Sequence, residues 1–570
     1  MKVMKFKSKF KYTIMALLSS SVIGFNSCDI DIVPQDRFTG EIVWSDPDVV
    51  ELYLNGLYAE IKSFQFGVFP GLGYDNAMDA LADGMKFTST VSGNGTVNTL
   101  ISNSNQFSPS SVGLNYWGSA YNRIRRINEF LGFLRTQSSF PEAEMLRIEA
   151  EARFIRAYTY HWLAKIHGSV VILKDINDYA EKDRQRSSES EVYDFMIEDL
   201  KFAAANLGNT SLAGRANKGT ANALLSRVAL YAGSIAKYDL NQFNTDELTG
   251  IPASRAKEYY KISADAAEAV ISSGVYQLEA DFASIFTRKV GQANKEAILR
   301  VDFVAPQLTH QYDFGYAPPR DNNGNTMDYG VPTADLVDEF EMADGTKFSW
   351  SNAAQAANPY EGREPRFYAS ILYHGAQWKD RTLNTSVGDA QEGFSQYGVL
   401  AEPRRTVTGY YTKKFLDPTN TNFGVNRSSQ SWIELRLGEV YLNLAEAKAG
   451  LDDYSGSAST LSELRTARGL NIINYNTAAT ALAAIEHERM VELAFEGHRF
   501  WDLRRWRKAH ITLNNRRVSG HRIEVAGQNV TYTTVQADDR DRSFTGRLYY
   551  LPIPEAEVQV NTALTQIKGW

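Results

Sequence analysis

The sequence predicts a mostly α-helical protein: a degenerate tetratricopeptide-like repeat of paired helices, with long loop-rich insertions and a few short strands. Several segments carry apolar residues at spacings of three and four, which places those residues on one face of a helix. These segments tend to come in pairs, with alanine or glycine where two helices would touch. Because an isolated pair of amphipathic helices cannot bury its apolar faces, we expect the pairs to stack.

The clearest expected helix covers residues 142–165. Its apolar face consists of Leu146, Ala150, Phe154, Ala157, Tyr158 and Trp162. Pro141 stands near its start, where a fixed φ and a missing N–H are tolerated. Gly168 follows its end, as expected of a glycine that caps the C-terminus of a helix.

Further helices are expected along most of the chain. One covers residues 218–233, with its apolar face at Ala221, Leu224, Leu225, Val228, Ala229 and Ala232. Another covers 434–448, with Leu437, Val440, Tyr441, Leu444 and Ala447. The remaining ones cover 46–61, 116–134, 191–205, 256–272, 458–467 and 480–496. The strict tetratricopeptide consensus is absent, so the repeat is inferred from the periodicity.

Two long irregular stretches separate these helices. Residues 67–113 are rich in Gly, Asn, Ser and Thr, and residues 282–430 carry turn residues, scattered aromatics and short alternating runs. Loops of this length in a compact protein are usually functional or disordered, and the aromatic content argues against disorder. A rigid helical scaffold that bears long aromatic loops is typical of a binding protein.

The first 27 residues read as a secretory signal. Five lysines precede a short, mostly apolar run at 14–25, which is too short to cross a bilayer, and the run ends just before Cys28. A cysteine at this point resembles the cleavage site of a bacterial lipoprotein, in which the new N-terminal cysteine carries acyl chains such as palmitate. Phe25 and Asn26 depart from the usual lipoprotein box.

Composition excludes several classes of function for the mature chain. Removing the leader with its five lysines changes the net charge from −7 to −12, which argues against nucleic acid as a partner. Cys28 is the only cysteine, so with a lipid on it the mature protein has no disulfide, no cysteine nucleophile and no cysteine metal ligand.

No catalytic or metal motif is complete. His487 and Glu488 begin an HExxH zinc motif, but Val491 stands where its second histidine belongs. No GxSxG sequence occurs. Residues 321–326 offer alternating oxygen ligands, but Pro332 replaces the glutamate that an EF-hand needs, so we expect no cofactor and leave a loose structural calcium open. The cluster His498, Arg499, Asp502 and Arg504 is interpreted as a structural helix end whose arginines pair with carboxylates.

Motifs in order along the chain resemble the SusD/RagB family of outer-membrane nutrient-binding lipoproteins. The strongest is ERMVELAFEGHRFWDLRRW at 488–506. EARFIRAY at 151–158 with HGSVVIL at 167–173, KGTANALLSRVALY at 218–231 and RLGEVYLNLAEA at 436–447 resemble its repeat helices. Other matches are PTADLVDEF at 332–340 with DG at 344–345, REPRF at 363–367, GYYTKKF at 409–415, LPIP at 551–554 and residues 561–570.

This resemblance implies the domains, the location and the partners of the protein. It implies a signal peptide at 1–27, an N-terminal SusD-like region at 28–280 with the repeat helices, and a RagB/SusD C-terminal region at 281–570. Such proteins are lipid-anchored on the outer face of the outer membrane, where they cover a SusC-like TonB-dependent transporter and deliver ligand to it. Asp29 and Asp31 resemble a surface-export tag of such proteins.

The expected function is therefore non-catalytic capture of an oligosaccharide. Flat aromatic rings stack on the apolar face of a sugar, and polar side chains bond its hydroxyls. The loops supply these candidates for ligand binding: Tyr74, Asn76, Phe87, Tyr312, Tyr316, Asn323, Trp350 and Trp378. Loop packing is the competing role for each ring, and Trp117, inside an expected helix, is assigned to the core. A peptide-binding subunit of the same kind of transporter and a surface glycosidase stay open as alternatives.

Replacing Cys28 with alanine tests the anchor. Without this thiol the mature N-terminus has no site for a lipid, so Cys28→Ala should move the protein from the membrane fraction to the soluble fraction and leave glycan binding intact. Fractionation followed by blotting measures the first effect, and affinity electrophoresis the second. A variant that stays in the membrane fraction would contradict the lipid assignment.

Overall fold

The structure is a computed structural model that describes residues 44, 46–61, 77–88, 101–238, 247–322, 330–397, 405–421 and 427–570. The expected leader and Cys28 lie outside these residues, as do Asp29 and Asp31. In the described part of the chain, no helix is both long and apolar enough to span a membrane. The fold is mostly α-helical with a few short strands, as the sequence predicts.

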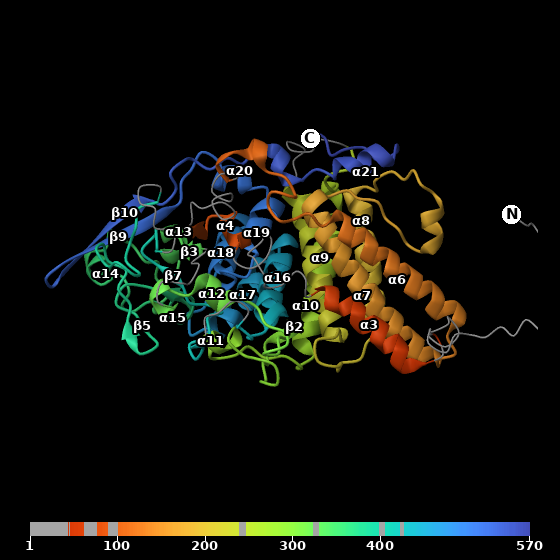
Figure 1. The fold of residues 1–570 in the computed structure, drawn as a ribbon, viewed down its shortest axis with the longest axis horizontal. Helices are drawn as coiled ribbons and strands as arrows, with labels where there is room; N and C mark the ends of the chain where they lie inside the picture. The colour runs from red at the N-terminus through yellow and green to blue at the C-terminus, as the bar shows by residue number, and fades with distance from the viewer. Residues whose placement is uncertain are drawn as a thin grey trace, which may run out of the picture.

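Long helices packed in sequence form the scaffold. Helix α6 packs on α7, α7 on α8, α8 on α9 and α9 on α10, and α10 then packs on α16, which contacts α17 and α18. In Figure 1 helices α6 to α10 stand side by side in one half of the molecule, next to α16 to α18. Their bounds are α3 Pro47–Ile61, α6 Trp117–Gln137, α7 Glu142–His167, α8 Glu189–Asn206, α9 Lys218–Tyr238, α10 Ala256–Ser272, α16 Leu437–Gly450, α17 Tyr454–Ala467 and α18 Ala478–Glu492.

Small residues allow these helices to approach one another. The ring of Tyr260 in α10 lies against Gly233 of α9, where an added Cβ would stand 3.0 Å from the ring. The same ring lies against Gly450 of α16, where a Cβ would stand 2.4 Å away. The expected role of glycine at helix contacts is thereby confirmed. At the end of α7, Gly168 has φ of +73° and caps the helix as predicted, and Trp117 at the start of α6 is buried.

Outside these helices, the described residues form short helices and five two-stranded antiparallel sheets. The short α-helices are α4 Ala77–Ala80, α11 Phe282–Ile285, α12 Tyr312–Tyr316, α13 Ala334–Val337, α14 Ala353–Ala357, α15 Pro365–Ser370, α19 Arg499–Arg505, α20 Ala509–Thr512 and α21 Glu555–Val560. The paired strands are β1 Met85–Phe87 with β3 Gly330–Pro332, β2 Ala297–Val301 with β8 Trp432–Arg436, β4 Ile371–Leu372 with β7 Tyr411–Thr412, β5 Gln377–Trp378 with β6 Arg381–Thr382, and β9 Ser519–Ala526 with β10 Asn529–Gln536. The β9–β10 hairpin extends away from the repeat helices in Figure 1.

Several expected helix boundaries are wrong: the helices expected at 218–233 and 458–467 are longer than predicted, and two others are predicted too far. Residues 434–436 belong to β8, because they pair with β2 and are buried on both faces, and the helix begins only at Leu437. The expected helix 480–496 ends at Glu492, since Phe495 and Gly497 take positive φ values of 64° and 76° and turn the chain. Both deviations come from tertiary contacts that override the local helical periodicity.

A buried ion-pair network joins the end of α18 to the segments around it. Glu492 is fully buried and accepts hydrogen bonds from Arg366 at 2.9 Å, Arg436 at 2.7 Å and Arg468 at 2.8 Å. Burial alone would raise the pKa of Glu492, but these three guanidinium groups outweigh it and hold that pKa well below its usual value. Gly438 is required beside them, because a Cβ there would stand 2.2 Å from Arg436 Nη1.

The substitution Glu492→Gln tests the importance of this network. The change removes a buried negative charge and leaves three arginines facing it, so the free energy of unfolding should fall by about 3–5 kcal/mol. Chemical denaturation followed by circular dichroism measures the loss. The control Asp265→Asn breaks the exposed pair Lys261–Asp265 and should cost less than about 1 kcal/mol. Equal losses in the two variants would show that the network is not a special source of stability.

Candidate functional site

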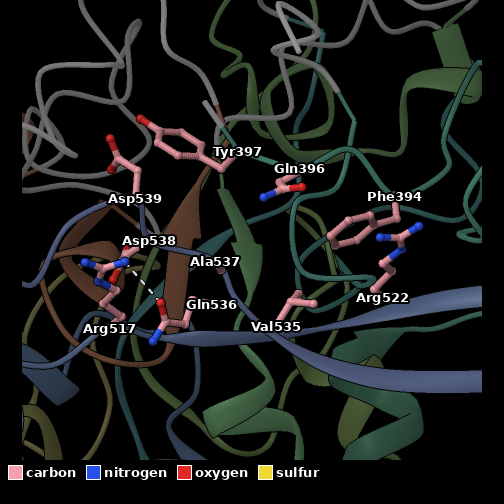
Figure 2. Close-up of a pocket in the computed structure, with 10 residues that line it drawn as sticks. All are labelled: Phe394, Gln396, Tyr397, Arg517, Arg522, Val535, Gln536, Ala537, Asp538 and Asp539. Atoms are coloured by element: carbon pink, nitrogen blue, oxygen red, sulfur yellow. Dashed lines mark hydrogen bonds between the residues drawn. The ribbon is translucent and has the colours of Figure 1, made fainter. Parts of the chain in front are cut away.

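Among the described residues, a pocket of about 570 Å³ lies beside the base of the β9–β10 hairpin. This volume falls in the range of small-molecule sites. Its lining combines two aromatic rings with charged and amide side chains: Phe394, Gln396, Tyr397, Arg517, Arg522, Val535, Gln536, Ala537, Asp538 and Asp539. Figure 2 shows these residues around the pocket, with Phe394 and Arg522 towards one side of the view and Arg517, Asp538 and Asp539 towards the other.

Alternate side chains of the β9–β10 hairpin form one wall of the pocket. Successive side chains of a strand point to opposite faces. Ile523 and Tyr532 are cross-strand partners on the face that packs on the protein, where Ile523 is buried and the Tyr532 ring lies 5.6 Å from that of Tyr360. Arg522 and Val535 stand at alternate positions and line the pocket.

Two glycines hold the hairpin in place. Gly409 has φ of +88°, and a Cβ there would stand 2.2 Å from the carbonyl oxygen of His521. A Cβ on Gly520 would stand 2.6 Å from the Cα of Thr408. Because neither position has a side chain, the two backbones meet, and His521 N donates to Thr408 O at 2.8 Å.

A buried charge cluster forms the floor. Lys86 Nζ lies 2.9 Å from Asp538 and 3.9 Å from the centre of the Tyr397 ring. Asp538 also pairs with Arg542 at 2.7 Å. Burial tends to raise the pKa of Asp538, but Arg542 and Lys86 outweigh it and lower that pKa to about 2. The carboxylate therefore stays ionised and keeps the cluster together at neutral pH.

The two arginines of the pocket make only exposed ion pairs. Arg517 donates to Gln536 Oε1 at 3.0 Å, drawn as the dashed line in Figure 2, and to Asp541 at 2.6 Å. Arg522 donates to Glu524 at 2.7 Å. Their side chains are 33% and 43% exposed. Exposed pairs of this kind are weak, so both guanidinium groups can exchange these partners for the hydroxyl or acidic groups of a ligand.

The structure buries four of the loop aromatics that the sequence nominates as ligand contacts. Phe87 lies in β1, and Tyr312 and Tyr316 stack with ring centres 4.7 Å apart inside α12. Trp378 is 3% exposed and donates from Nε1 to Asp321 at 2.6 Å. No face of these rings is open to solvent in this arrangement.

Among the nominated rings within the described residues, Trp350 is the most exposed. It is half-buried, donates from Nε1 to Asp338 at 2.9 Å, and its ring centre lies 5.6 Å from that of Tyr532 on the inner face of the hairpin. Tyr74, Asn76 and Asn323 lie outside the described residues. The predicted ligand contacts therefore stay a prediction.

Sequence reasoning missed the residues that line the pocket. The available signal was the alternation of residues 519–536 around a Gly527-containing turn, which is typical of a hairpin with one buried face. Nothing in the local pattern of residues 394–397 indicated that the hairpin would lie beside them, because the two segments are more than 100 residues apart.

The cluster at 498–504 is structural, as predicted. Arg499 pairs with Asp83 at 2.8 Å, and Asp502 is buried between Arg489 and Arg505 at 2.8 Å from each. Arg504 differs from the prediction, because it donates to the carbonyl oxygens of Lys165 and Tyr549 and pairs with no carboxylate among the residues that the structure describes.

Asp321, the first oxygen ligand of the calcium loop that the sequence leaves open, is bonded to other side chains. Both carboxylate oxygens of Asp321 are bonded, one to Trp378 Nε1 and the other to Arg381 at 2.5 Å. Within the described ranges, no group of three or more His, Cys, Asp or Glu side chains could hold a metal ion.

Comparison with known families gives two matches. The SusD family model matches residues 295–570. A second model, described as starch-binding and associating with the outer membrane, matches residues 57–230. Among relatives from Formosa agariphila, SusD-like protein P2 is 25% identical over 472 residues, which is 79% of each chain. SusD-like protein P38 is 23% identical over 89% of this chain and 92% of its own.

Solved structures share the whole fold. A SusD-like protein from Bacteroides fragilis is 27% identical and superposes with a TM-score of 0.76 over 93% of this chain and 98% of its own. A SusD-like carbohydrate-binding protein from the same species, at 23% identity, gives 0.75 over 92% of this chain and all of its own. A laminarin-binding SusD-like protein, at 21% identity, gives 0.64 with the same coverage. Because the last two structures are less than 25% identical to this chain, they show that the fold is shared and no more.

The Asp538 cluster should make the pocket floor sensitive to acid. A carboxyl group whose pKa is lowered on folding contributes stability above its unfolded pKa of about 4, and that stability is lost as the pH falls from about 4 to about 2. Asp538→Asn should therefore lower the free energy of unfolding by about 2 kcal/mol at pH 7 and by about half as much at pH 3. Denaturant titrations at both pH values measure it, with the exposed Asp541→Asn as control. A constant difference between the two pH values would disprove the linkage.

Proposed function

The chain belongs to the SusD family, and on that basis we propose that it is a non-catalytic, lipid-anchored glycan-binding protein of the outer membrane. In this proposal it captures an oligosaccharide at the cell surface and delivers it to a partner SusC-like TonB-dependent transporter. The lipid is carried by Cys28. A tether of this kind keeps the binding protein beside its transporter, which a soluble protein would have to find by diffusion.

The pocket beside the β9–β10 hairpin is the observation that carries the proposal. It has the two parts that a sugar site requires: the rings of Phe394 and Tyr397, and around them the amides of Gln396 and Gln536. Tyr397 is fixed by Lys86 over one side of its ring. Side chains held by packing and by a charged floor bind at a lower entropic cost than side chains that must be ordered by the ligand.

The relatives point to the same ligand class. One similar structure is described as a carbohydrate-binding protein and another as a laminarin-binding protein. The family model over residues 57–230 is described as starch-binding and associating with the outer membrane. These descriptions support a glycan as ligand and the outer membrane as location.

The chemistry of the pocket supports binding without catalysis. Glycoside hydrolysis needs a carboxylic acid that stays protonated near neutral pH to protonate the leaving oxygen. Of the two carboxylates in the lining, Asp538 and Asp539, the buried Asp538 is unsuited to this role, because Arg542 and Lys86 outweigh the effect of burial and lower its pKa to about 2. Its oxygens are also held by the salt bridges of the floor.

Affinity measurements on pocket variants test the function. We expect the purified mature protein to bind a polysaccharide on affinity gels and to release no reducing sugar from it. Tyr397→Ala and Arg522→Ala should each weaken binding about tenfold, which corresponds to about 1.4 kcal/mol. Gln396→Ala, at an exposed position of the pocket, gives a variant with little risk to the fold.

Controls separate the pocket from the aromatic residues first nominated. Trp350→Ala and Trp378→Ala are measured in parallel, and Arg125→Ala changes an exposed arginine on α6, far from the hairpin in sequence. Unchanged affinity in all three pocket variants, with loss in Trp350→Ala or Trp378→Ala, would move the site to the predicted loop residues. Binding of peptides but of no glycan would favour a peptide-binding subunit, and sugar release abolished by one carboxylate change would show an enzyme.

A further inference from the structure

Another groove lies at the opposite end of the molecule from the β9–β10 hairpin. This α6–α8 groove consists of two adjoining cavities of about 570 Å³ and about 350 Å³, both lined by Asp178 and Arg184. The larger one lies between α6, residues 178–184 and residues 557–564, and the smaller one extends along α8. In Figure 1 helices α6, α8 and α21 lie towards one end of the long axis and the hairpin at the other. Among the described residues, none lines both this groove and the hairpin pocket.

Aromatic rings form an apolar surface in the larger cavity. Trp117 is buried and supports Tyr121, one turn further along α6, with ring centres 4.8 Å apart. Tyr121 and Tyr179 are half-buried, so each keeps surface that a ligand can contact. The hydroxyl of Tyr121 donates to Val171 O at 2.8 Å, which fixes the ring before any ligand arrives. Fixed, flat rings of this kind suit the apolar face of a sugar.

Gly118 leaves open space in the wall of the same cavity. It lies in the first turn of α6 without a positive φ, so the backbone conformation does not require glycine. Apart from its chain neighbours and its own helix backbone, a Cβ here would meet no atom within 4 Å, whereas Tyr260 contacts Gly233 and Gly450. Packing therefore does not require glycine either, although glycine is a poor helix former. Close approach of a ligand to the backbone is a further reason for a glycine, and it fits this position.

The rim of the groove offers hydrogen-bond donors and acceptors side by side. Glu198 and Glu557 are exposed carboxylates, Lys174 and Lys182 are exposed ammonium groups, and the side chains of these four form no ion pair among the described residues. Nε of Arg184 is buried and has no hydrogen-bond partner in the described chain. An amine can only donate and a sulfate can only accept, whereas each hydroxyl of a sugar does both. The rim therefore favours a ligand that carries many hydroxyls.

The charge of the lining restricts the class of sugar further. Seven carboxylates and three cations line the two cavities. One of these carboxylates, Asp194, is paired with Arg255 at 2.6 Å, and an excess of negative charge remains. This excess repels uronate and sulfated glycans. Because Lys174 and Lys182 stand among the carboxylates, a strongly cationic ligand does not meet an uninterrupted acidic surface either.

We propose that the α6–α8 groove is a second saccharide site and that it binds a neutral oligosaccharide. The inference rests on the proposed function, since it assigns the same class of ligand to a different part of the chain. The sugar rings lie against Tyr121 and Tyr179 beside Gly118, and the hydroxyls bond the charged rim. The common wall of the two cavities, at Asp178 and Arg184, lets one linear chain occupy both. A polysaccharide held at one site is then retained while it leaves the other, which raises avidity when one glycan reaches both sites.

Calorimetric titration of the full mature chain tests the proposal. The probes are four neutral tetrasaccharides, namely maltotetraose, laminaritetraose, cellotetraose and mannotetraose, with tetragalacturonate as the anionic counterpart and tetralysine as the cationic one. Gly118→Leu introduces a good helix former into open space and fills the cavity, so it should weaken binding of at least one neutral probe about tenfold or more. The matched control Ser119→Leu adds the same side chain at the next exposed residue of α6, outside both linings, and should leave binding unchanged.

The hairpin variant Tyr397→Ala separates this site from the hairpin pocket. Binding that Gly118→Leu weakens and Tyr397→Ala leaves intact supports the second site, even where the hairpin pocket binds nothing. Binding lost only in Tyr397→Ala, or no tetrasaccharide binding that depends on Gly118, would overturn the proposal. Tetralysine binding that Gly118→Leu abolishes, without any tetrasaccharide binding, would overturn it too and assign the groove to a basic peptide. Should Gly118→Leu not fold, Glu557→Gln at the exposed rim decides, with an expected loss of about fivefold.

Discussion

The neutralisation of buried arginines at the end of α18 is the constraint on which the C-terminal half of the structure depends. Six carboxylates and five cations meet there in the described chain: Glu296, Glu341, Glu364, Glu488, Glu492 and Glu496 with Arg366, Lys414, Arg436, Arg465 and Arg468. Each arginine comes from a different segment or helix turn, so the charges can be satisfied only when those segments meet in one arrangement. Such a network specifies a fold more strongly than it stabilises one, because ion desolvation offsets much of the attraction.

The same network sets the position of the ligand pocket. Lys414 Nζ donates to Glu496 at 2.7 Å, which fixes the chain just after β7. Thr408 and Gly409, a few residues earlier, are the backbone against which β9 lies. The hairpin in turn presents Arg522 and Val535 to the pocket. The end of α18 is thus connected to the pocket in three steps: the buried ion pair of Lys414, the backbone contact at Gly409 and the β9–β10 hairpin. The pocket itself contains no residue of α18.

These connections explain what the sequence could and could not reveal. Helices α7, α9 and α10 follow from their own periodicity, which is local and survives in the folded protein. The pairing of Trp432–Arg436 with β2 was hidden, because its partner lies more than 100 residues away and the same residues also fit a helical stripe. The pocket was hidden for the same reason. Its aromatic residues could not be told apart from Tyr312 or Trp378, which occur in similar loops but pack inside.

The buried charges around Glu492 and those around Lys165 and Arg504 are compensated in different ways. Around Glu492 the described chain supplies more carboxylates than cations, and every arginine there pairs with at least one of them. Around Lys165 and Arg504 the chain supplies guanidinium and ammonium groups, and the acceptors are neutral carbonyl oxygens and ring faces. Carbonyl dipoles and indole rings reduce the energy of a buried cation but leave its charge uncancelled. The carboxylates around Glu492 offset the cost of burying the cations there, whereas around Lys165 this cost is offset only in part, and burial lowers the pKa of Lys165 well below its usual value.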